Sequence, residues 1–324
     1  MGKGLYSVSV RDKNYCSDTE NLYLRFSDTF KPKILLKKPK IYLNSNGIAS
    51  LQLAQLDSGI SDNCEVNSVV ISKISFNCSD LGINTVQVTA SDLSGNKTIG
   101  STVVYVLDTI KPTIVSKSAN IYLNSAGLAN LYKTDVNKSS YDNCKIDSVL
   151  ISKSSFNCAN LGVNQISLRV IDNSKNQSVA NVYVTVIDTV LPTVKYKNIN
   201  CYLNTSGIGK IIPQDVNNGS FDNCGIVSYA LSQQTFDCSQ IGANFVDFIL
   251  ADKAGNSVSQ SVKITVIDTI CPKVKINAKS LYLNQFGYVV LSPSDIDSAS
   301  TDNCKISTKT ISKSVFTCGS IGNN

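Results

Sequence analysis

The chain has 324 residues, of which 42% are hydrophobic and 17% are charged, with 30 basic against 24 acidic side chains. This composition is apolar enough for a folded core and excludes a highly charged disordered tail. The chain contains no histidine, which excludes histidine-based nucleophile pairs, general bases and metal sites. No apolar run approaches the roughly 18 residues of a membrane-spanning helix, so we expect no membrane insertion in this segment.

One unit of 80 residues repeats along the whole chain without insertion or deletion. Its most regular phrase is Asp-Asn-Cys, which begins at Asp62, Asp142, Asp222 and Asp302. A Tyr-Leu-Asn triplet followed by a glycine recurs in the same register, with the glycines at Gly47, Gly127, Gly207 and Gly287. The register predicts whole repeats over residues 29–108, 109–188 and 189–268 and truncated repeats over 1–28 and 269–324. We therefore expect a fragment of a longer array.

Within each unit the hydrophobic pattern has a period of two, which predicts β-strands. In the first whole repeat, in chain order, we expect strands at residues 69–72 and 75–77, a third over 86–90, a hairpin turn at 92–96 and a strand at 102–106. A short linker with a proline follows at 108–112. About seven short strands in 80 residues are typical of a small immunoglobulin-like β-sandwich. The fold class we predict is all-β, with tandem sandwiches forming an elongated rod.

Eight of the 11 cysteines recur twice per repeat, fourteen positions apart. Zinc would need acidic ligands or two repeats, and free buried thiols would suit a cytosolic protein. We favour disulfides, hence an oxidising extracellular compartment, because closing a loop of about 15 residues contributes roughly 3 kcal/mol. Cys16, Cys201 and Cys271 fall outside the pattern, and we expect no pairing among them. The predicted pairs lie within repeats: Cys64 with Cys78, Cys144 with Cys158, Cys224 with Cys238, and Cys304 with Cys318.

No cofactor is required by the sequence, and Ca²⁺ is the one candidate. The loop before three of the Asp-Asn-Cys phrases offers hard oxygen ligands of the kind that Ca²⁺ binds. Capped turns would use the same side chains, and the first repeat breaks the pattern with Gln55 and Asp57. Asp108, Asp188 and Asp268 at the linkers are a second possible place for the ion, although a capped turn explains them equally well. The predicted loop ligands are Asp135, Asn137 and Asp142, then Asp215, Asn217 and Asp222, then Asp295, Asp297 and Asp302.

The unit resembles a known family through four phrases: Asp62-Asn63-Cys64, Phe76-Asn77-Cys78, the turn from Asp92 to Asn96, and Asp108-Thr109 with Pro112. These phrases and their counterparts are similar to the SprB-type and HYR-like repeats of giant cell-surface proteins, best known as gliding adhesins of Bacteroidota. The resemblance implies an immunoglobulin-like fold, export to the outer cell surface and a role in cell adhesion and gliding motility. The second repeat departs from it, since the turn there reads Asn173-Ser174-Lys175 and lacks the glycine.

Four copies of one motif on a spacer-like sandwich are not where one active site is expected, so we predict that the chain is not an enzyme. A basic face interleaved with stacking aromatic residues is not evident, which argues against a nucleic-acid partner. We predict a repeat segment of a large exported bacterial cell-surface adhesin or stalk that holds a distal binding region away from the cell. Its expected partners are neighbouring repeats of the same chain and surface polysaccharide. The alternatives are a low-affinity glycan-binding array and a spacer module of a secreted polysaccharide-degrading enzyme.

Overall fold

The computed structural model describes residues 2–322, so residue 1 of the first predicted segment and residues 323–324 of the last lie outside it. The chain forms two compact units, each described by itself. The first comprises the residues up to Ala119, Leu131–Ser154 and Asn164–Val184, and the second comprises Asn120–Asn130, Ser155–Val163 and the residues from Thr185 onward.

The first unit begins with an antiparallel hairpin of β1 (Gly2–Arg11) and β2 (Ser17–Phe26), in which Arg11 pairs with Ser17. A β-sandwich follows. In its largest sheet the strand order is β4-β10-β9-β7, and two smaller sheets pair β5 with β8 and β3 with β6. The elements are β3 (Lys33–Leu36), β4 (Lys40–Tyr42), β5 (Ile48–Ser50), α1 (Leu53–Leu56), β6 (Asp57–Ser61), β7 (Val66–Ile71), β8 (Ser75–Asn77), η1 (Cys78–Asp80), β9 (Gly82–Asp92) and β10 (Lys97–Leu107).

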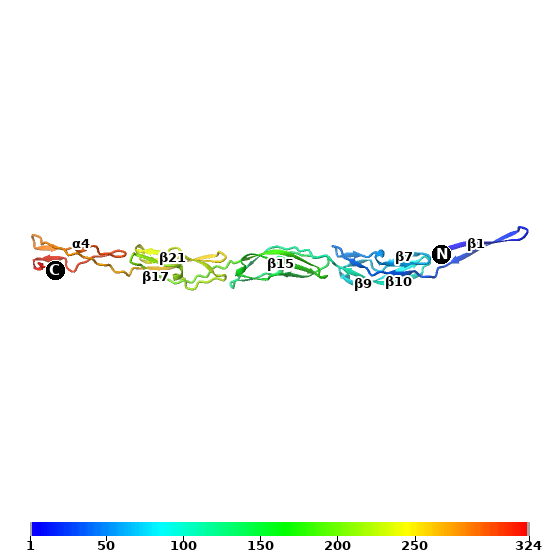
Figure 1. The fold of residues 1–324 in the computed structure, drawn as a ribbon, viewed down its shortest axis with the longest axis horizontal. Coiled ribbons are helices and arrows are strands. Elements are labelled where there is room, and N and C mark those ends of the chain that lie inside the picture. The colour runs from blue at the N-terminus through cyan, green and yellow to red at the C-terminus, as the bar shows by residue number, and fades with distance from the viewer. Residues whose placement is uncertain (1, 323–324) are drawn as a thin grey trace. The chain divides into compact units, whose positions relative to one another are not determined.

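This strand order confirms the predicted immunoglobulin-like sandwich. Strands β7, β9 and β10 form the three-stranded part of one sheet, which β4 joins in parallel to β10, and the β5–β8 pair belongs to the opposite sheet. Figure 1 shows β9 and β10 lying side by side, as their antiparallel register requires.

The second repeat contributes residues to both units and has the same elements 80 positions later. Within single units, β13 pairs with β15 and β12 with β14. The elements are β11 (Ala119–Tyr122), β12 (Leu128–Asn130), α2 (Lys133–Val136), β13 (Ile146–Ile151), β14 (Ser155–Asn157), η2 (Cys158–Asn160), β15 (Gly162–Asp172) and β16 (Gln177–Ile187).

The second unit contains a complete further sandwich, with sheets ordered β17-β22-β21-β19 and β18-β20. Its elements are β17 (Ile199–Tyr202), β18 (Ile208–Lys210), α3 (Pro213–Val216), β19 (Ile226–Leu231), β20 (Thr235–Asp237), η3 (Cys238–Gln240), β21 (Gly242–Asp252) and β22 (Ser257–Ile267). The last described segment holds β23 (Tyr288–Val290), α4 (Pro293–Ile296), β24 (Val315–Thr317) and η4 (Cys318–Ser320), with β23 paired to β24.

The hairpin turn between the two long strands forms where the sequence predicts it. In the first repeat the Asp92 carboxylate accepts hydrogen bonds from the backbone N–H of Asn96 at 2.8 Å and from its side-chain amide at 2.7 Å. Gly95 takes a φ of 92°, a conformation that glycine adopts without strain. In the second repeat Lys175 replaces this glycine and still takes a φ of 72°, so the same turn forms there at a steric cost.

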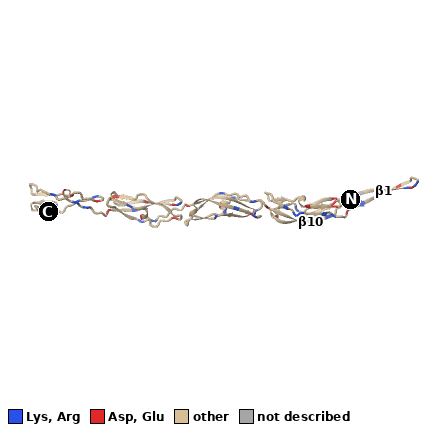
Figure 2. Cartoon of the chain, in the orientation of Figure 1, with Lys and Arg blue, Asp and Glu red and all other residues tan. Residues whose placement is uncertain are grey.

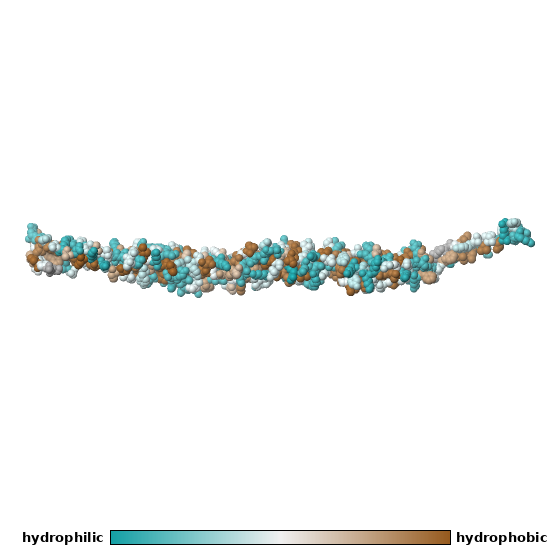
Figure 3. Space-filling model, viewed as in Figure 1, coloured by the Kyte–Doolittle hydropathy of each residue, from teal (hydrophilic) through white to brown (hydrophobic). Residues whose placement is uncertain are grey.

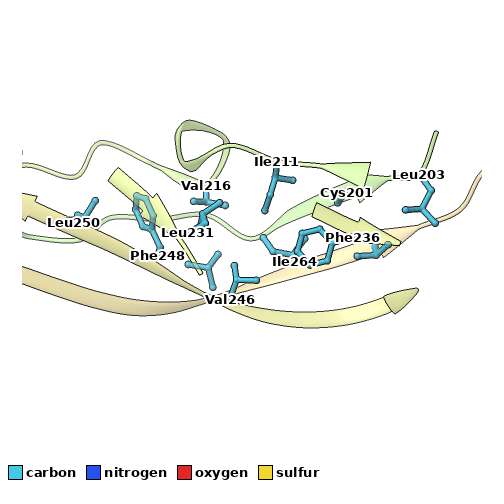
Figure 4. Packing of buried hydrophobic residues seen from close by; sticks show 12 residues of the cluster. Cys201, Leu203, Ile211, Val216, Leu231, Phe236, Val246, Phe248, Leu250 and Ile264 are labelled. Atoms are coloured by element: carbon cyan, nitrogen blue, oxygen red, sulfur yellow. The ribbon is translucent and has the colours of Figure 1, made fainter. Parts of the chain in front are cut away.

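The alternating residues of the long strands build the core. Val86, Val88 and Ala90 of β9 are fully buried, with more exposed residues between them. Figure 4 shows the equivalent cluster of the third repeat, where Phe236 and Phe248 are fully buried among aliphatic side chains. Cys201 is part of this cluster and is 3% exposed, so it acts as a small hydrophobic residue, and burial raises the pKa of its thiol.

The surface is mixed in character. Figure 2 shows basic and acidic residues interspersed along the chain, consistent with a net charge of +6. On the face drawn in Figure 3 hydrophilic and hydrophobic residues alternate. Among residues 2–322, none of the helices is long and apolar enough to cross a membrane.

Candidate functional site

Three disulfides join successive repeats, beginning with the first whole repeat. The bonds are Cys78–Cys144, Cys158–Cys224 and Cys238–Cys304, each between residues 66 positions apart. The pairing within repeats that the sequence analysis predicted is therefore wrong, although six of its eight cysteines are disulfide-bonded. The other two, Cys64 and Cys318, are free and exposed, as are Cys16 and Cys271 outside the pattern.

The fold explains why two cysteines only fourteen positions apart do not pair. Cys64 lies just before Val66, which pairs with Asp92 at the end of β9, whereas Cys78 lies just before Gly82 at the start of that strand. A strand of this length spans about 35 Å, and a disulfide needs Cα atoms within about 7 Å. The two cysteines of one repeat thus lie at opposite ends of its sandwich, and each is placed to meet an adjacent repeat.

A glycine of one repeat packs against the bridge to the next. Gly127 has a φ of 71°, and a Cβ added there would lie 2.7 Å from the sulfur of Cys158 and 2.9 Å from the backbone oxygen of Asn223. Gly47 meets the sulfur of Cys78 and the backbone oxygen of Asn143 in the same way, and Gly207 meets those of Cys238 and Asn303. This contact, together with the positive φ, accounts for the recurrence of glycine after each Tyr-Leu-Asn triplet.

The asparagine of each Asp-Asn-Cys phrase connects two repeats by hydrogen bonds. The side-chain amide of Asn223 donates to the backbone oxygen of Asn124 at 3.0 Å and to the Asp188 carboxylate at 3.1 Å. Asn143 and Asn303 make the equivalent bonds, to Asp108 at 3.1 Å and Asp268 at 2.9 Å. Asn256 adds a further contact by donating to the backbone oxygen of Asp188 at 3.1 Å. We refer to these linked ends of successive repeats as junctions.

Three carboxylates meet in each of two junctions. One oxygen from each of Asp188, Asp222 and Asp252 lies within 4.8 Å of the other two, and Asp108, Asp142 and Asp172 form the same group 80 positions earlier. Asp188 is only 4% exposed and Asp252 2%. We call these two groups the aspartate triads. Each draws one acid from the end of a repeat and two from the following repeat.

Several oxygens in the triads are buried without a hydrogen-bond partner among the described residues. In the second triad these are Oδ2 of Asp188, Oδ1 of Asp222 and the neighbouring Oδ1 of Asn223. In the first triad Oδ1 of Asp142 and Oδ1 of Asn143 are in the same state. Burial raises the pKa of Asp142, and the negative charges of Asp172 and Asp108 raise it further. The triads therefore hold more negative charge and more acceptors than the protein itself satisfies.

The predicted calcium ligands lie in two different kinds of place, in locally capped turns and in the triads. Oδ2 of Asp135 accepts from the backbone of Tyr132, and Oδ1 of Asn137 accepts from Ser140, so both oxygens cap local turns, whereas Asp142 lies in a triad. In the third repeat Asp215 and Asn217 make the same capping bonds, whereas Asp222 lies in a triad. In the last segment Asp295 and Asp297 bind Lys279 and Lys309, and Oδ2 of Asp302 is buried without a partner.

Sequence reasoning found part of this site and missed the rest. Asp142 and Asp222 were predicted as ligands, and Asp108 and Asp188 as a second possible place. Asn143, Asn223, Asp172 and Asp252 were read as motif and turn residues only. Their signal was present in the sequence, because each recurs at an interval of 80 residues and so keeps a constant separation from the linker acid that it meets in space.

No family model matches the chain, and no curated protein matches it. Among solved structures it resembles human CDH23 EC21-23, at 12% identity and a TM-score of 0.34, over 73% of this chain and 100% of that one. It also resembles PcdhgB3 EC1-4, at 11% identity and a TM-score of 0.29, over 82% and 83% of the two chains. Likenesses at these scores do not extend to function, and the resemblance to SprB-type and HYR-like repeats stays a prediction.

Proposed function

We propose that the chain is a repeat segment of a large exported adhesin or stalk of the bacterial cell surface, holding a distal binding region away from the cell. The observation that carries this proposal is the series of disulfides between successive repeats. From the first whole repeat onward, each repeat is joined to the next twice, once by the linker peptide and once by a disulfide. Disulfides of this kind persist in oxidising compartments, which supports an extracellular location.

The disulfides strongly limit how far the chain extends under tension. Each bridge carries the load past the residues between its two cysteines. Force therefore passes from Cys78 directly to Cys144 and from Cys158 directly to Cys224. Between Cys78 and Cys304, only the fourteen-position stretches between bridges, such as the one from Cys144 to Cys158, remain free to extend. At roughly 3.5 Å per residue such a stretch reaches only about 50 Å, close to the span of a folded strand plus its loops.

The pairing of the cysteines decides this property. A bridge within each repeat would lock fourteen positions and leave 66 free, whereas the bridges of the structure lock 66 and leave fourteen. From Cys78 to Cys304 the oxidised chain reaches about 110 Å when every repeat is unfolded, and the reduced chain about 800 Å. A tether with oxidised junctions keeps its length after its domains unfold, which is a useful property for a stalk that carries a binding region.

Single-molecule pulling on the full chain tests the proposal. We expect the segment from Cys78 to Cys304 of the oxidised chain to lengthen by almost nothing before the chain detaches from the pulling probe. In dithiothreitol the same segment should lengthen by several hundred Å in steps, as its domains unfold. A variant with Cys158→Ser and Cys224→Ser should release the extra length of one bridge only. Cys64→Ser, which removes a free thiol, is the matched control and should extend like the unmodified chain. Long extension of the oxidised chain would refute the mechanical role.

A further inference from the structure

We propose that the two aspartate triads bind calcium ions, one at the Asp188, Asp222 and Asp252 triad and one at the Asp108, Asp142 and Asp172 triad. This inference goes beyond the proposed function, which stands on the disulfides alone. The ion would lie between consecutive repeats, since each triad takes its acids from both.

The first support is the buried oxygen of Asp188. This side chain is 4% exposed, and its Oδ2 has no hydrogen-bond partner among the described residues, while its Oδ1 accepts from Asn223 and from the backbone of Val190. A buried carboxylate oxygen without a donor costs free energy unless a cation or a proton satisfies it. Oδ1 of Asp222, from the same triad, is buried in the same unsatisfied state.

The second support is the charge of the group. Three carboxylate oxygens within 4.8 Å of one another repel, and the burial of two of the three side chains limits screening by water. The third acid of the triad, Asp252, has both of its oxygens satisfied by Asn256, which fixes the orientation of its carboxylate. A divalent cation would offset two of the three negative charges of the triad without disturbing these bonds.

The donor set favours calcium over other metals. The two triads offer only hard oxygen donors, with the amide oxygens of Asn143 and Asn223 next to them, and the chain has no histidine. Ca²⁺ takes six to eight oxygen ligands in flexible geometry, whereas Mg²⁺ demands a near-ideal octahedron and Zn²⁺ prefers nitrogen and sulfur. Three carboxylates, one amide and bound water supply such a set.

Calcium titration of the full oxidised chain, after dialysis against EDTA, tests the inference. By calorimetry we expect about two ions to bind per chain at or below millimolar free calcium, and we expect calcium to raise the melting temperature. Asp188→Asn should bind one ion fewer, and Asp108→Asn with Asp188→Asn should bind neither. Asn keeps the accepting Oδ1 of each side chain, so these variants retain the bonds from Asn143 and Asn223.

Asp215→Asn is the matched control, because Asp215 is one of the ligands that the sequence predicts for residues 189–268 and it lies in the capped loop, outside the triad. It should bind as many ions as the unmodified chain. The inference is overturned if the unmodified chain shows no calcium heat and no thermal shift, if Asp188→Asn binds undiminished, or if Asp215→Asn loses an ion. Should Asp188→Asn fail to fold by circular dichroism, Asp222→Asn gives the same reading. None of these outcomes alters the pulling experiment, so the two proposals fail separately.

Discussion

Asp188 and Asp28 hold the same position in two different repeats, yet their surroundings differ. Asp188 is buried and Asn223 beside it is half-buried, whereas Asp28 is half-buried and its partner Asn63 is exposed. Both asparagines donate to their aspartate, at 3.1 and 3.2 Å. The same residue types are therefore present at both places, and something else decides how deeply they are buried.

The difference lies in what covers the loop. At Asp188 the neighbouring cysteine is bonded to Cys158, and Gly127 packs on the backbone of Asn223. At Asp28 the corresponding Cys64 is free and exposed, and a hydrogen bond to Asp28 raises the pKa of its thiol. Where the preceding repeat is bonded to the following one, both the acid that ends it and the asparagine that this acid meets are more buried. A junction is a property of two repeats together, and no single repeat contains it.

Removing one bridge should make a disulfide-bonded junction resemble the exposed loop at Asp28, where the cysteine is free. We expect Cys158→Ser with Cys224→Ser to lower the free energy of unfolding of the adjoining repeats by about 2–5 kcal/mol, because the unfolded chain gains the freedom of a long loop. Urea unfolding followed by circular dichroism measures the loss. Cys64→Ser, in the exposed loop, should change the unfolding midpoint little. Equal losses in both variants would mean that the bridge adds nothing to the junction.

The glycine contact can be examined separately from the bridge. Gly127 and Gly287 have nearly equal φ values, 71° and 74°, so alanine suffers the same backbone strain at either place. A Cβ at Gly127 would contact both Cys158 and Asn223 too closely, whereas at Gly287 it would meet only the sulfur of Cys318, at 3.0 Å. We expect Gly127→Ala to cost about 1–3 kcal/mol more than Gly287→Ala in chemical unfolding, because the junction is overpacked. Identical costs would show that backbone strain alone selects glycine here.

The sequence was sufficient to predict each sandwich but not the contacts between sandwiches. Period-two alternation, as in Val86 and Val88, predicts strands and their buried face because this pattern depends only on neighbouring residues. The turn at Asp92 is predictable for the same reason. The partner of Cys78 is not, since its pairing depends on which end of a sandwich each cysteine occupies, and the shortest sequence separation is a poor guide to that. Asp172 and Asp252 escaped notice because their role as turn caps explains them fully until the adjacent repeat is present.

The loop acid Asp297 has hydrogen-bond partners of the kind that the triad acid Asp188 lacks on one of its oxygens. Asp297, the counterpart of Asn217, accepts hydrogen bonds from Lys309 and from Ser300, and these bonds, the one from Lys309 most of all, lower its pKa to about 2. Oδ2 of Asp188 has no donor among the residues that the structure describes. The loop acid is thus satisfied by its own repeat, which is why we place no ion there.

Lys309→Ala should raise the pKa of Asp297 from about 2 toward its ordinary value of 3.8, stopping short of it because Ser300 still donates. The folded-state pKa lies below the unfolded one, so this carboxylate stabilises the fold above about pH 4 and loses that contribution as the pH falls toward 2. The effect on stability is small, since the pair is exposed to solvent. NMR titration of the side-chain carboxyl measures the shift, with Lys305→Ala as the control that should leave it in place. An unmoved pKa in Lys309→Ala would mean that Ser300 and the loop backbone satisfy Asp297 without the lysine.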